Sequence, residues 1–428
     1  MSVCPSFKRL FVTFRPPDYS PDDGTARVLT RRRKILGFLG LALIAEIAVV
    51  IAFLGSGGDD EPARTALPLH PVAQSFTPDG TQLDECSDQS CFEQAFGNVA
   101  YYRGPKAALT LFDETLDAGD PSCHRIAHVI GAASLSRYEG NVARTFAEGS
   151  SSCFSGYYHG VLERALIGVE SRDAARLGEV ARGLCEDPQV RSTRWMAYQC
   201  FHGLGHGLMI TTGYGLPISL KACDRISTHL DRTSCKSGVF MENISSSYGV
   251  ESRWVSDEDP VYPCNAIAQD DKITCYGMVT SRILRVIGLD WETTAEICST
   301  VEKGFVSTCF RSMGRDISGQ THREADEIVT LCGAARPYGA EAECISAAAM
   351  DMTSNYTSGT QAAGLCEAAP SQTRGECYYG IGGVMGRFRT TPAEREADCR
   401  ALTRNPEHLA LCIEGTEIKG PLSVALAR

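Results

Sequence analysis

Residues 293–317 read TTAEICSTVEKGFVSTCFRSMGRDI, and this stretch decides the fold. An amphipathic segment ends near Cys298, a short loop follows, and a second amphipathic segment begins at Cys309. Amphipathic segments with apolar residues at helical spacing predict helices that bury one face. Because one cysteine lies at the end of the first segment and the other at the start of the second, we expect a disulfide across the turn. The stretch therefore predicts a helical hairpin closed by one cystine.

The same cysteine pair recurs along the chain with a period near 34 residues. Successive pairs are 33 to 41 residues apart, and the two cysteines of a pair are 11 to 15 residues apart. A period of this length is typical of helical-hairpin solenoids. We predict an all-α fold, an α-solenoid of ~34-residue hairpins that are each closed by a disulfide. The seven predicted disulfides are Cys185–Cys200, Cys223–Cys235, Cys264–Cys275, Cys298–Cys309, Cys332–Cys344, Cys366–Cys377 and Cys399–Cys412.

This period and the paired cysteines resemble tetratricopeptide-type arrays and related cysteine-rich secreted solenoids. The resemblance stops there, because the Trp/Leu-Gly/Tyr signature of tetratricopeptide repeats is absent, and it carries no functional residues to this chain.

The region before the repeats fits the period less well. Its cysteines, Cys86, Cys91, Cys123 and Cys153, allow three disulfide connectivities, and the sequence does not choose between them. We expect helices near 92–103, 105–117, 121–138 and 151–167.

An apolar segment near the N-terminus indicates the compartment. Residues 35–54 read ILGFLGLALIAEIAVVIAFL, with Glu46 as the single charge. A helix of this length is about 30 Å long, which matches the hydrocarbon core of a bilayer. The run RRRK at 31–34 precedes it and acidic residues at 59–61 follow, so the N-terminus is predicted to be cytoplasmic and the C-terminal domain extracytoplasmic. The alternative is a cleaved signal peptide, against which the long leader and the lack of an A-x-A-like site count.

Both alternatives place the bulk of the chain in an oxidising compartment. The chain has 19 cysteines, too many for an ordinary reduced cytosolic enzyme. With Cys4 on the cytoplasmic side, 18 remain outside, an even number as a disulfide framework requires. The resulting domain prediction is a cytoplasmic tail, a transmembrane helix, a flexible linker, an N-terminal helical region with His motifs and the repeats. Their ranges are 1–34, 35–54, 55–85, 86–170 and 171–428.

Composition excludes several classes of protein. The chain is 43% hydrophobic, which is enough for a large core and excludes collagen-like and wholly disordered chains. The formal net charge is -11, although residues 1–34 are basic, so the remainder is strongly acidic. A strongly acidic body argues against a nucleic-acid partner.

Histidines form the most informative motif. Of nine His, five lie in CHRIAH (123–128), GYYHGVLE (156–163) and CFHGLGHG (200–207). Each motif places two potential metal ligands four residues apart, on one face of a helix. Helical proteins build dinuclear centres from such pairs. We therefore predict a transition-metal site, with copper, iron or zinc as candidates. Its predicted ligands are His124, His128, His159, Glu163, His202 and His206.

Counting residues from the second cysteine of each unit gives partial support for a shared metal site. His159 and His206 both fall at +6, and Met241 has the same offset after Cys235. His124 and His128 fall at +1 and +5, roughly 100° around the helix, so they join the site only if their helix is rotated.

Glycines beside these histidines suggest a close approach to the backbone. They are Gly131, Gly156, Gly160, Gly203, Gly205 and Gly207. Either a neighbouring helix or a planar cofactor, such as haem ligated by two His, would explain them.

Three functional hypotheses follow from the sequence. The first is an envelope protein with a His-rich metal site, for which a redox role is one option; the second is a metal-free scaffold whose solenoid face binds a protein partner; the third is a bis-His haem protein. Whether the protein is an enzyme is undetermined. Shared coordination requires the imidazoles of His124, His159 and His206 to converge within about 5 Å.

Overall fold

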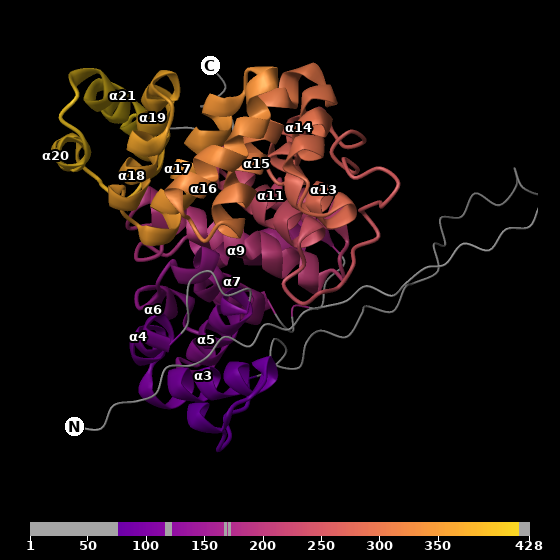
Figure 1. The fold of residues 1–428 in the computed structure, drawn as a ribbon. Coiled ribbons are helices and arrows are strands. Elements are labelled where there is room, and N and C mark those ends of the chain that lie inside the picture. Colours follow the sequence, from indigo (N-terminus) through magenta and orange to yellow (C-terminus); the bar gives the residue numbers. More distant parts are fainter. Residues whose placement is uncertain (1–75, 116–121, 167–168, 170–172, 419–428) are drawn as a thin grey trace, which may run out of the picture. The chain divides into compact units, whose positions relative to one another are not determined.

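The computed structural model describes residues 76–115, 122–166, 169 and 173–418, and all regular secondary structure in these ranges is helical (Figure 1). The first part follows the expected helices, with the short α6 in addition. Its elements are η1 (Leu83–Glu85), α3 (Gln89–Arg103), α4 (Pro105–Thr115), α5 (Cys123–Arg137), α6 (Val142–Phe146) and α7 (Ser152–Leu166).

From residue 173 onward the helices form the repeating hairpins that the cysteine period predicts. The first hairpins are α8 (Ala174–Cys185) with α9 (Arg194–Thr211) and α10 (Leu216–Cys223) with α11 (His229–Ile244). After an irregular third repeat come α14 (Trp291–Thr300), η2 (Lys303–Phe305) and α15 (Val306–Gln320), then α16 (Ala325–Cys332), η3 (Gly333–Tyr338) and α17 (Glu341–Tyr356). The last two hairpins are α18 (Thr360–Ala368), η4 (Ser371–Thr373) and α19 (Arg374–Met385), then α20 (Pro392–Leu402) and α21 (Pro406–Thr416).

Polar residues define where many of these helices begin. Asp173, Thr193, Thr228 and Asp290 each accept a hydrogen bond from a backbone N–H in the first turn of the following helix. Such caps satisfy N–H groups that have no partner within the helix. The hairpins are therefore set by local sequence signals as well as by their cystines.

The third repeat departs from the prediction. Cys264 lies in a turn and not at the end of a helix, so this repeat lacks its first helix. Its second helix is divided into α12 (Gln269–Tyr276) and α13 (Val279–Ile287). This repeat carries the insertion that lengthens the cysteine spacing, and residues 245–268 form an irregular connection before it.

All seven predicted cysteine pairs are disulfides in the structure. The open connectivity is resolved as Cys86–Cys91 and Cys123–Cys153. The second of these joins the N-terminal ends of α5 and α7, and not the two helices of one hairpin. The N-terminal cystines therefore do not continue the pattern of the repeats.

The second helices of successive units pack against one another. Contacts run from α3 to α5, α7, α9 and α11, and again from α13 to α15, α17, α19 and α21, as Figure 1 shows. One apolar core follows these helices from Phe76 to Cys412. It crosses the predicted boundary at 170/171 without interruption, so the two predicted regions share a single core.

Helical repeats are confirmed, but the repeats do not contact only their sequence neighbours. The Trp195 backbone N–H donates to the Arg387 carbonyl at 3.1 Å, and Arg194 donates to the carbonyls of Gly386 and Ile418 at 2.6 and 2.8 Å. Helix α17 also contacts α7. A solenoid has contacts between neighbouring repeats alone. These seams bring α9 beside α19 and α21, and the solenoid stays a prediction.

Most of the predicted N-terminal organisation lies outside the described residues, including the tail, residues 35–54 and the linker up to 75. Within the described ranges, no helix is long and apolar enough to span a bilayer. The expected linker extends too far in one respect, because Phe76 is buried in the core and Asn98 bonds to Asp79 and Thr81.

Candidate metal centre

The six predicted ligands come together between α5, α7 and α9. The imidazole centroid of His159 lies 5.3 Å from that of His124 and 4.3 Å from that of His206. Of the six side chains, His124 is partly buried and the others are buried. His159 thus lies close to both of the imidazoles with which shared coordination was expected.

Two of these histidines are held through Nδ1 by neutral acceptors. His124 Nδ1 lies 2.8 Å from the Cys153 carbonyl oxygen, which can only accept. His202 Nδ1 lies 2.7 Å from Ser237 Oγ, and this hydroxyl already donates to the Ser234 carbonyl at 2.7 Å. Because each hydroxyl has one hydrogen, Ser237 must accept from His202. In both histidines Nδ1 carries the hydrogen and Nε2 carries the lone pair.

The remaining two histidines, His128 and His206, are held through Nδ1 by the carboxyl groups of glutamates. His128 Nδ1 lies 3.0 Å from Glu163 Oε2, and His206 Nδ1 lies 2.8 Å from Glu242 Oε2. Histidines that bind metals characteristically donate their second ring N–H to a carboxylate or a carbonyl, which fixes the tautomer and the ring orientation. Where Nδ1 is the donor in these contacts and the imidazole is neutral, Nε2 is the electron-pair donor.

These Nε2 atoms face each other in two pairs. His128 Nε2 lies 3.0 Å from His124 Nε2, and His206 Nε2 lies 3.4 Å from His202 Nε2. At this distance either a proton shared as a hydrogen bond or a cation bound to both nitrogens would hold the two rings together. Two nitrogen ligands at the usual distance from one tetrahedral metal ion lie about 3.3 Å apart. Each pair thus has the spacing of two ligands on one cation.

His159 lies between the two pairs. Its nitrogens complete two sets of three, one with His124 and His128 and the other with His202 and His206, whose ligand atoms lie within 4.8 Å of one another. The residue is 1% exposed, and neither ring nitrogen has a hydrogen-bond partner among the described residues. An unsatisfied buried polar group costs about 1–3 kcal/mol, a cost that a bound metal ion would remove.

Two buried carboxylates complete the centre. Glu163, Glu242 and His206 form a third set with ligand atoms within 4.8 Å. The Tyr248 hydroxyl donates to Glu163 Oε2 at 2.6 Å, while Glu163 Oε1 has no partner in the part of the chain that the structure describes. The Tyr214 hydroxyl donates to Glu242 Oε1 at 2.9 Å. The hydroxyls orient the carboxylates, and the second oxygen of Glu163 remains for a ligand.

The electrostatics of the cluster favour neutral imidazoles. Burial lowers the pKa of His124 and of His206 to about 3, and it lowers the pKa of His159 and of His202 well below the ordinary value. Neutral imidazole is the form that binds metals. At neutral pH these four histidines require no proton to be displaced before they coordinate an ion.

The two carboxylates repel each other. Burial and then the charge of Glu163 raise the pKa of Glu242 to about 8. Burial alone would raise the pKa of Glu163, but the facing His128 brings it below its ordinary value. A cation between the two groups would stabilise both as carboxylates.

The structure corrects the register inferred from the sequence. Glu242 contributes the carboxylate of α11, and Met241, which has the expected offset, lines the cavities beside the cluster. The cysteines do not mark equivalent points, because α9 begins at Arg194, well before Cys200, whereas α7 begins one residue before its cysteine. A buried acidic residue in the next repeat was the signal that could have identified Glu242.

The sequence register predicts that His124 and His128 point away from the site, but the structure shows them facing α7. Their offset was counted from a cysteine that begins α5, and not from the second cysteine of a disulfide.

The glycines are explained by helix packing. A Cβ on Gly160 would lie 1.9 Å from the His128 carbonyl oxygen, and one on Gly205 would lie 2.1 Å from the Cys235 carbonyl oxygen. Glycines far from the histidines make the same contact, with a Cβ on Gly314 at 2.0 Å from the Cys344 oxygen. The glycines therefore give no support for a haem.

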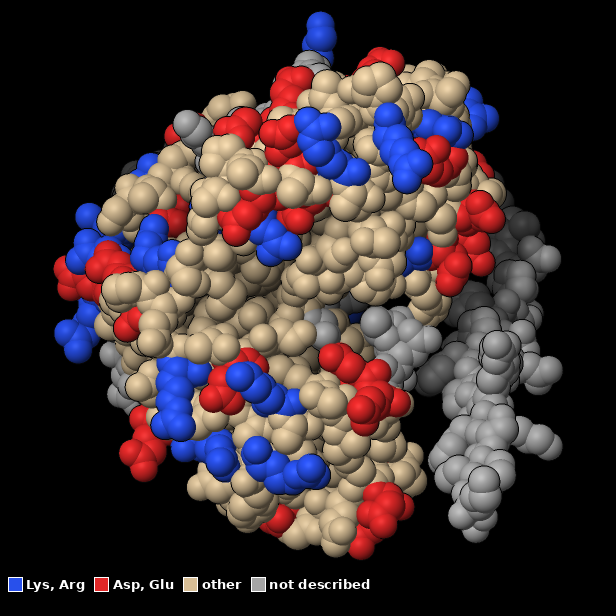
Figure 2. All heavy atoms as spheres, turned by 90° about the vertical axis from the view of Figure 1, so that its left-hand side faces the viewer, with Lys and Arg blue, Asp and Glu red and all other residues tan. Residues whose placement is uncertain are grey.

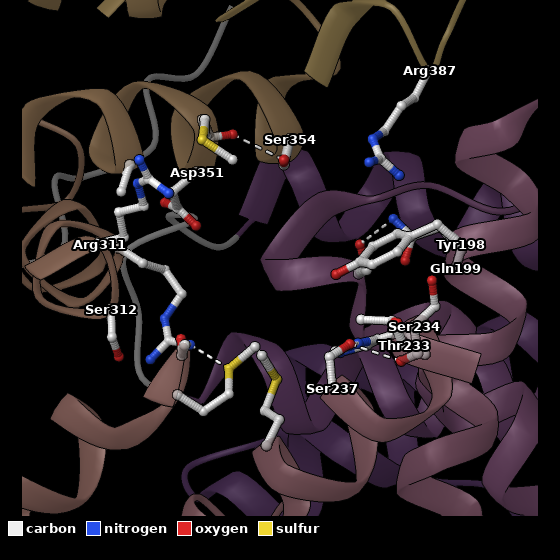
Figure 3. A pocket seen from close by; sticks show the side chains of 18 of the residues that line it. Tyr198, Gln199, Thr233, Ser234, Ser237, Arg311, Ser312, Asp351, Ser354 and Arg387 are labelled. Carbon is white, nitrogen blue, oxygen red and sulfur yellow. Dashed lines mark hydrogen bonds between the residues drawn. The ribbon is translucent and has the colours of Figure 1, made fainter. Parts of the chain in front are cut away.

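Two cavities reach the cluster from different directions. One, of about 260 Å³, is lined by His159 and His202 and is shown in Figure 3; the other, of about 590 Å³, is lined by His124 and His206. Met241, Met278 and Arg315 line both. The centre is buried but accessible to small molecules.

On the described part of the face drawn in Figure 2, Lys and Arg are interspersed with Asp and Glu. No family model, no curated protein and no solved structure matches this chain.

Proposed function

We propose that this protein is a membrane-anchored, extracytoplasmic metalloprotein whose helices α5, α7, α9 and α11 bind up to two transition-metal ions. The observation that carries the proposal is the two facing Nε2 pairs, 3.0 and 3.4 Å apart, on imidazoles that are each held in place by a hydrogen bond at Nδ1. His159, without a hydrogen-bond partner among the described residues, would provide a third nitrogen to either pair.

The donor set narrows the choice of metal. Five imidazoles and two carboxylates suit zinc, copper and iron, and they are poor ligands for calcium or magnesium. Cysteine thiolates do not compete, because each cysteine among the described residues is in a disulfide. Copper or iron would supply redox chemistry, including electron transfer or reaction with oxygen; zinc would not.

The chain's own residues would act mainly by orientation and charge. Ser237, Tyr214 and Tyr248 hold ligand groups in place, and Glu163 and Glu242 compensate the charge of bound cations. Cys123–Cys153 joins the N-terminal ends of α5 and α7, and Cys223–Cys235 links the middle of α11 to the end of α10. This preorganisation reduces the conformational entropy that metal binding must overcome.

The proposed location rests on the apolar segment 35–54, on the flanking charges and on the disulfides. Nine cystines are typical of an oxidising compartment. Carbonate extraction of membranes tests the anchor: the full chain should stay in the pellet, and a chain lacking residues 1–54 should be released. Release of the full chain would contradict membrane anchoring without affecting the metal site.

Metal analysis of the full-length protein, purified from an oxidising compartment in mild detergent, tests the metal centre. The native protein should contain stoichiometric copper, iron or zinc, and the double variant His159→Ala/His206→Ala should contain almost none. His322→Ala/His408→Ala is the matched control, since both of its histidines lie outside the cluster. Absence of metal from the native protein, also after incubation with each ion, would instead favour the metal-free scaffold with a protein partner.

A further inference from the structure

One buried amide in the wall of the smaller cavity has a polar atom without a hydrogen-bond partner. Gln199 of α9 is 0% exposed, and its Nε2 donates to Ser155 Oγ at 2.7 Å. Its Oε1 has no partner among the described residues. Exchange of the two amide atoms would leave the amino group without a partner in place of the oxygen. Because buried polar groups are nearly always hydrogen-bonded, this amide indicates a bound polar group.

The amide lies beside residues of the candidate metal centre. Gln199 comes three residues before His202 on α9, and Ser155 comes four residues before His159 on α7. All four residues line the cavity of about 260 Å³. One helical turn rises about 5.4 Å. A group that binds at Gln199 is therefore held about one helical turn from two of the imidazoles.

The same helix provides an aromatic wall to the cavity. The Trp195 and Tyr198 rings are stacked with centroids 5.5 Å apart, and the Tyr198 and His202 rings are stacked at 5.3 Å. Figure 3 shows Tyr198 and Gln199 on the same side of the cavity. Leu230 and Met350 add apolar surface to the lining. Aromatic rings in such a wall make favourable edge-to-face or offset contacts with a further aromatic ring.

The charged groups of the lining have partners within the protein. Arg315 pairs with Asp316 at 2.6 Å. Burial lowers the pKa of Arg311, and the Glu343 carboxylate opposes this effect. Arg387 also interacts with other groups of the chain. The lining therefore favours a neutral ligand.

The size of the cavity and the chemistry of the amide define this ligand further. An apolar cavity of about 150 Å³ is large enough to hold benzene, so about 260 Å³ accommodates one aromatic ring with a substituent. A hydroxyl group both donates and accepts a hydrogen bond, so it would satisfy the Gln199 amide in either orientation.

We infer that this cavity binds a small phenol, with its ring against the aromatic wall of α9 and its hydroxyl at Gln199. The hydroxyl then lies beside His159 and His202, so the inference gives the substrate class of the proposed metal centre and in that respect rests on the proposed function. Binding of the phenol itself requires only the cavity, so the two claims can be tested separately.

Equilibrium dialysis of the full-length protein tests the inference, with the same mild detergent on both sides so that uptake by micelles cancels. The probes at pH 7 are phenol, toluene, cyclohexanol and benzoate, each with chelator-treated and with metal-loaded protein. Phenol should bind more tightly than toluene by about tenfold or more, because a site with a buried hydrogen-bonding group rejects an analogue that lacks the hydroxyl. Cyclohexanol, without an aromatic ring, and benzoate, with a charge, should also bind more weakly than phenol.

Gln199→Met keeps the length of the side chain and removes the amide, so it should abolish the preference for phenol over toluene. Gln361→Met is the matched control, because Gln361 is an exposed residue of α18 that does not line the cavity. The comparison of probes on the native protein needs no variant, so it remains decisive if Gln199→Met fails to fold.

Toluene or benzoate binding as tightly as phenol, an unchanged preference in Gln199→Met or an equal loss in Gln361→Met would overturn the inference. Selective phenol binding by a protein that takes up no metal would support the cavity site and refute the metal centre. Metal uptake without selective phenol binding would do the reverse.

Discussion

Helices α5 to α11 and helices α15 to α21 are built on the same close contact and bury different polar groups. In the first set, Gly160 of α7 lies against the His128 carbonyl of α5; in the second, Gly382 of α19 lies against the Cys412 carbonyl of α21. A Cβ at either glycine would lie 1.9 or 2.0 Å from the oxygen it faces. The backbone architecture is therefore shared between the two sets.

The polar groups between the helices differ in how they are satisfied. On the later side, Thr280 Oγ1 lies 2.6 Å from Ser312 Oγ and donates to Asp316 Oδ2 at 2.7 Å. Ser318 similarly donates to Asp351 at 2.8 Å. On the earlier side, His159 has no hydrogen-bond partner among the described residues, and two pairs of imidazole Nε2 atoms face each other. The same scaffold thus holds hydroxyl–carboxylate networks on the later side and a buried imidazole without a hydrogen-bond partner among the described residues on the earlier side.

This comparison shows which features belong to the shared helical scaffold and which belong to the candidate site. Glycines and cystines occur in both sets and explain the packing, whereas the clustered histidines of the described chain occur only in the first. A bound metal ion would satisfy the imidazole nitrogens of the first set, as the hydroxyl groups satisfy the carboxylates of the second.

The largest expected effect is the loss of His159. Replacement by Ala should weaken metal binding by more than about 100-fold, since the loss of a supporting residue alone typically costs 10–100-fold. Ser312→Ala, on the later side, should leave metal affinity unchanged. Competition with a chromophoric chelator measures both. Equal affinities for the native protein and His159→Ala would show that His159 is not a ligand.

A Cβ added at the close glycine contact should destabilise the packing in both sets of helices. Gly160→Ala and Gly314→Ala should each lower the free energy of unfolding by about 1–3 kcal/mol or more, because neither backbone can yield without moving a helix. Gly183 and Gly364 are the controls, since they are helical glycines at which an added Cβ would meet nothing within 4 Å. Their replacement by Ala should stabilise by up to about 1 kcal/mol. Chemical denaturation distinguishes the outcomes; a neutral Gly314→Ala would refute the shared contact.

Acid should destabilise the metal-free protein through its histidines. The pKa of His124 and of His206 is about 3 in the folded chain and near 6.5 ordinarily, so the unfolded chain binds protons first as the pH falls. Stability is then complete above about pH 6.5 and is lost toward pH 3, at up to about 1.4 kcal/mol per pH unit for each group. Glu242, with a pKa raised to about 8, acts in the opposite sense, because its contribution is lost as the pH rises through 8.

Urea unfolding of chelator-treated protein between pH 4.5 and 6.5 measures this dependence. The native slope should exceed that of His124→Gln/His206→Gln. Identical slopes would show that the two imidazoles are protonated in the folded chain.

The smallest expected effect comes from removing the hydroxyl that orients Glu163. Tyr248→Phe removes the hydroxyl that donates to Glu163 and should weaken metal binding by about 10-fold. Tyr378→Phe, which removes an equivalent bond to Glu367 on the later side, should not change it. Isothermal titration with zinc compares the two variants. An unchanged affinity in Tyr248→Phe would exclude Glu163 from the ligand set or show that its position does not depend on Tyr248.

Much of this arrangement could be predicted from local spacing. The cysteine period identifies the hairpins and their disulfides, because both partners of each cystine are close in sequence. The i, i+4 pairs identify six residues of the cluster, because a helix places such residues on one face. Residues that depend on how helices are offset could not be found in this way, as Glu242 illustrates.

Contacts over long sequence separations were also beyond prediction. Tyr248 reaches Glu163 from an irregular connection 85 residues later in the chain. The seam between Trp195 and Arg387 depends on the curvature of the whole stack, which no single repeat encodes. The smaller cavity beside the histidine cluster is lined by both of these residues.

X-ray absorption spectroscopy of the metal-loaded full-length protein tests the central claim most directly. We expect nitrogen and oxygen ligands at about 2.0–2.1 Å with the multiple-scattering signature of two or more imidazoles for each ion. That signature should be lost in His159→Ala/His206→Ala. A spectrum of the native protein dominated by sulfur, or one without imidazole scattering, would contradict the assignment of the histidine cluster as the metal centre.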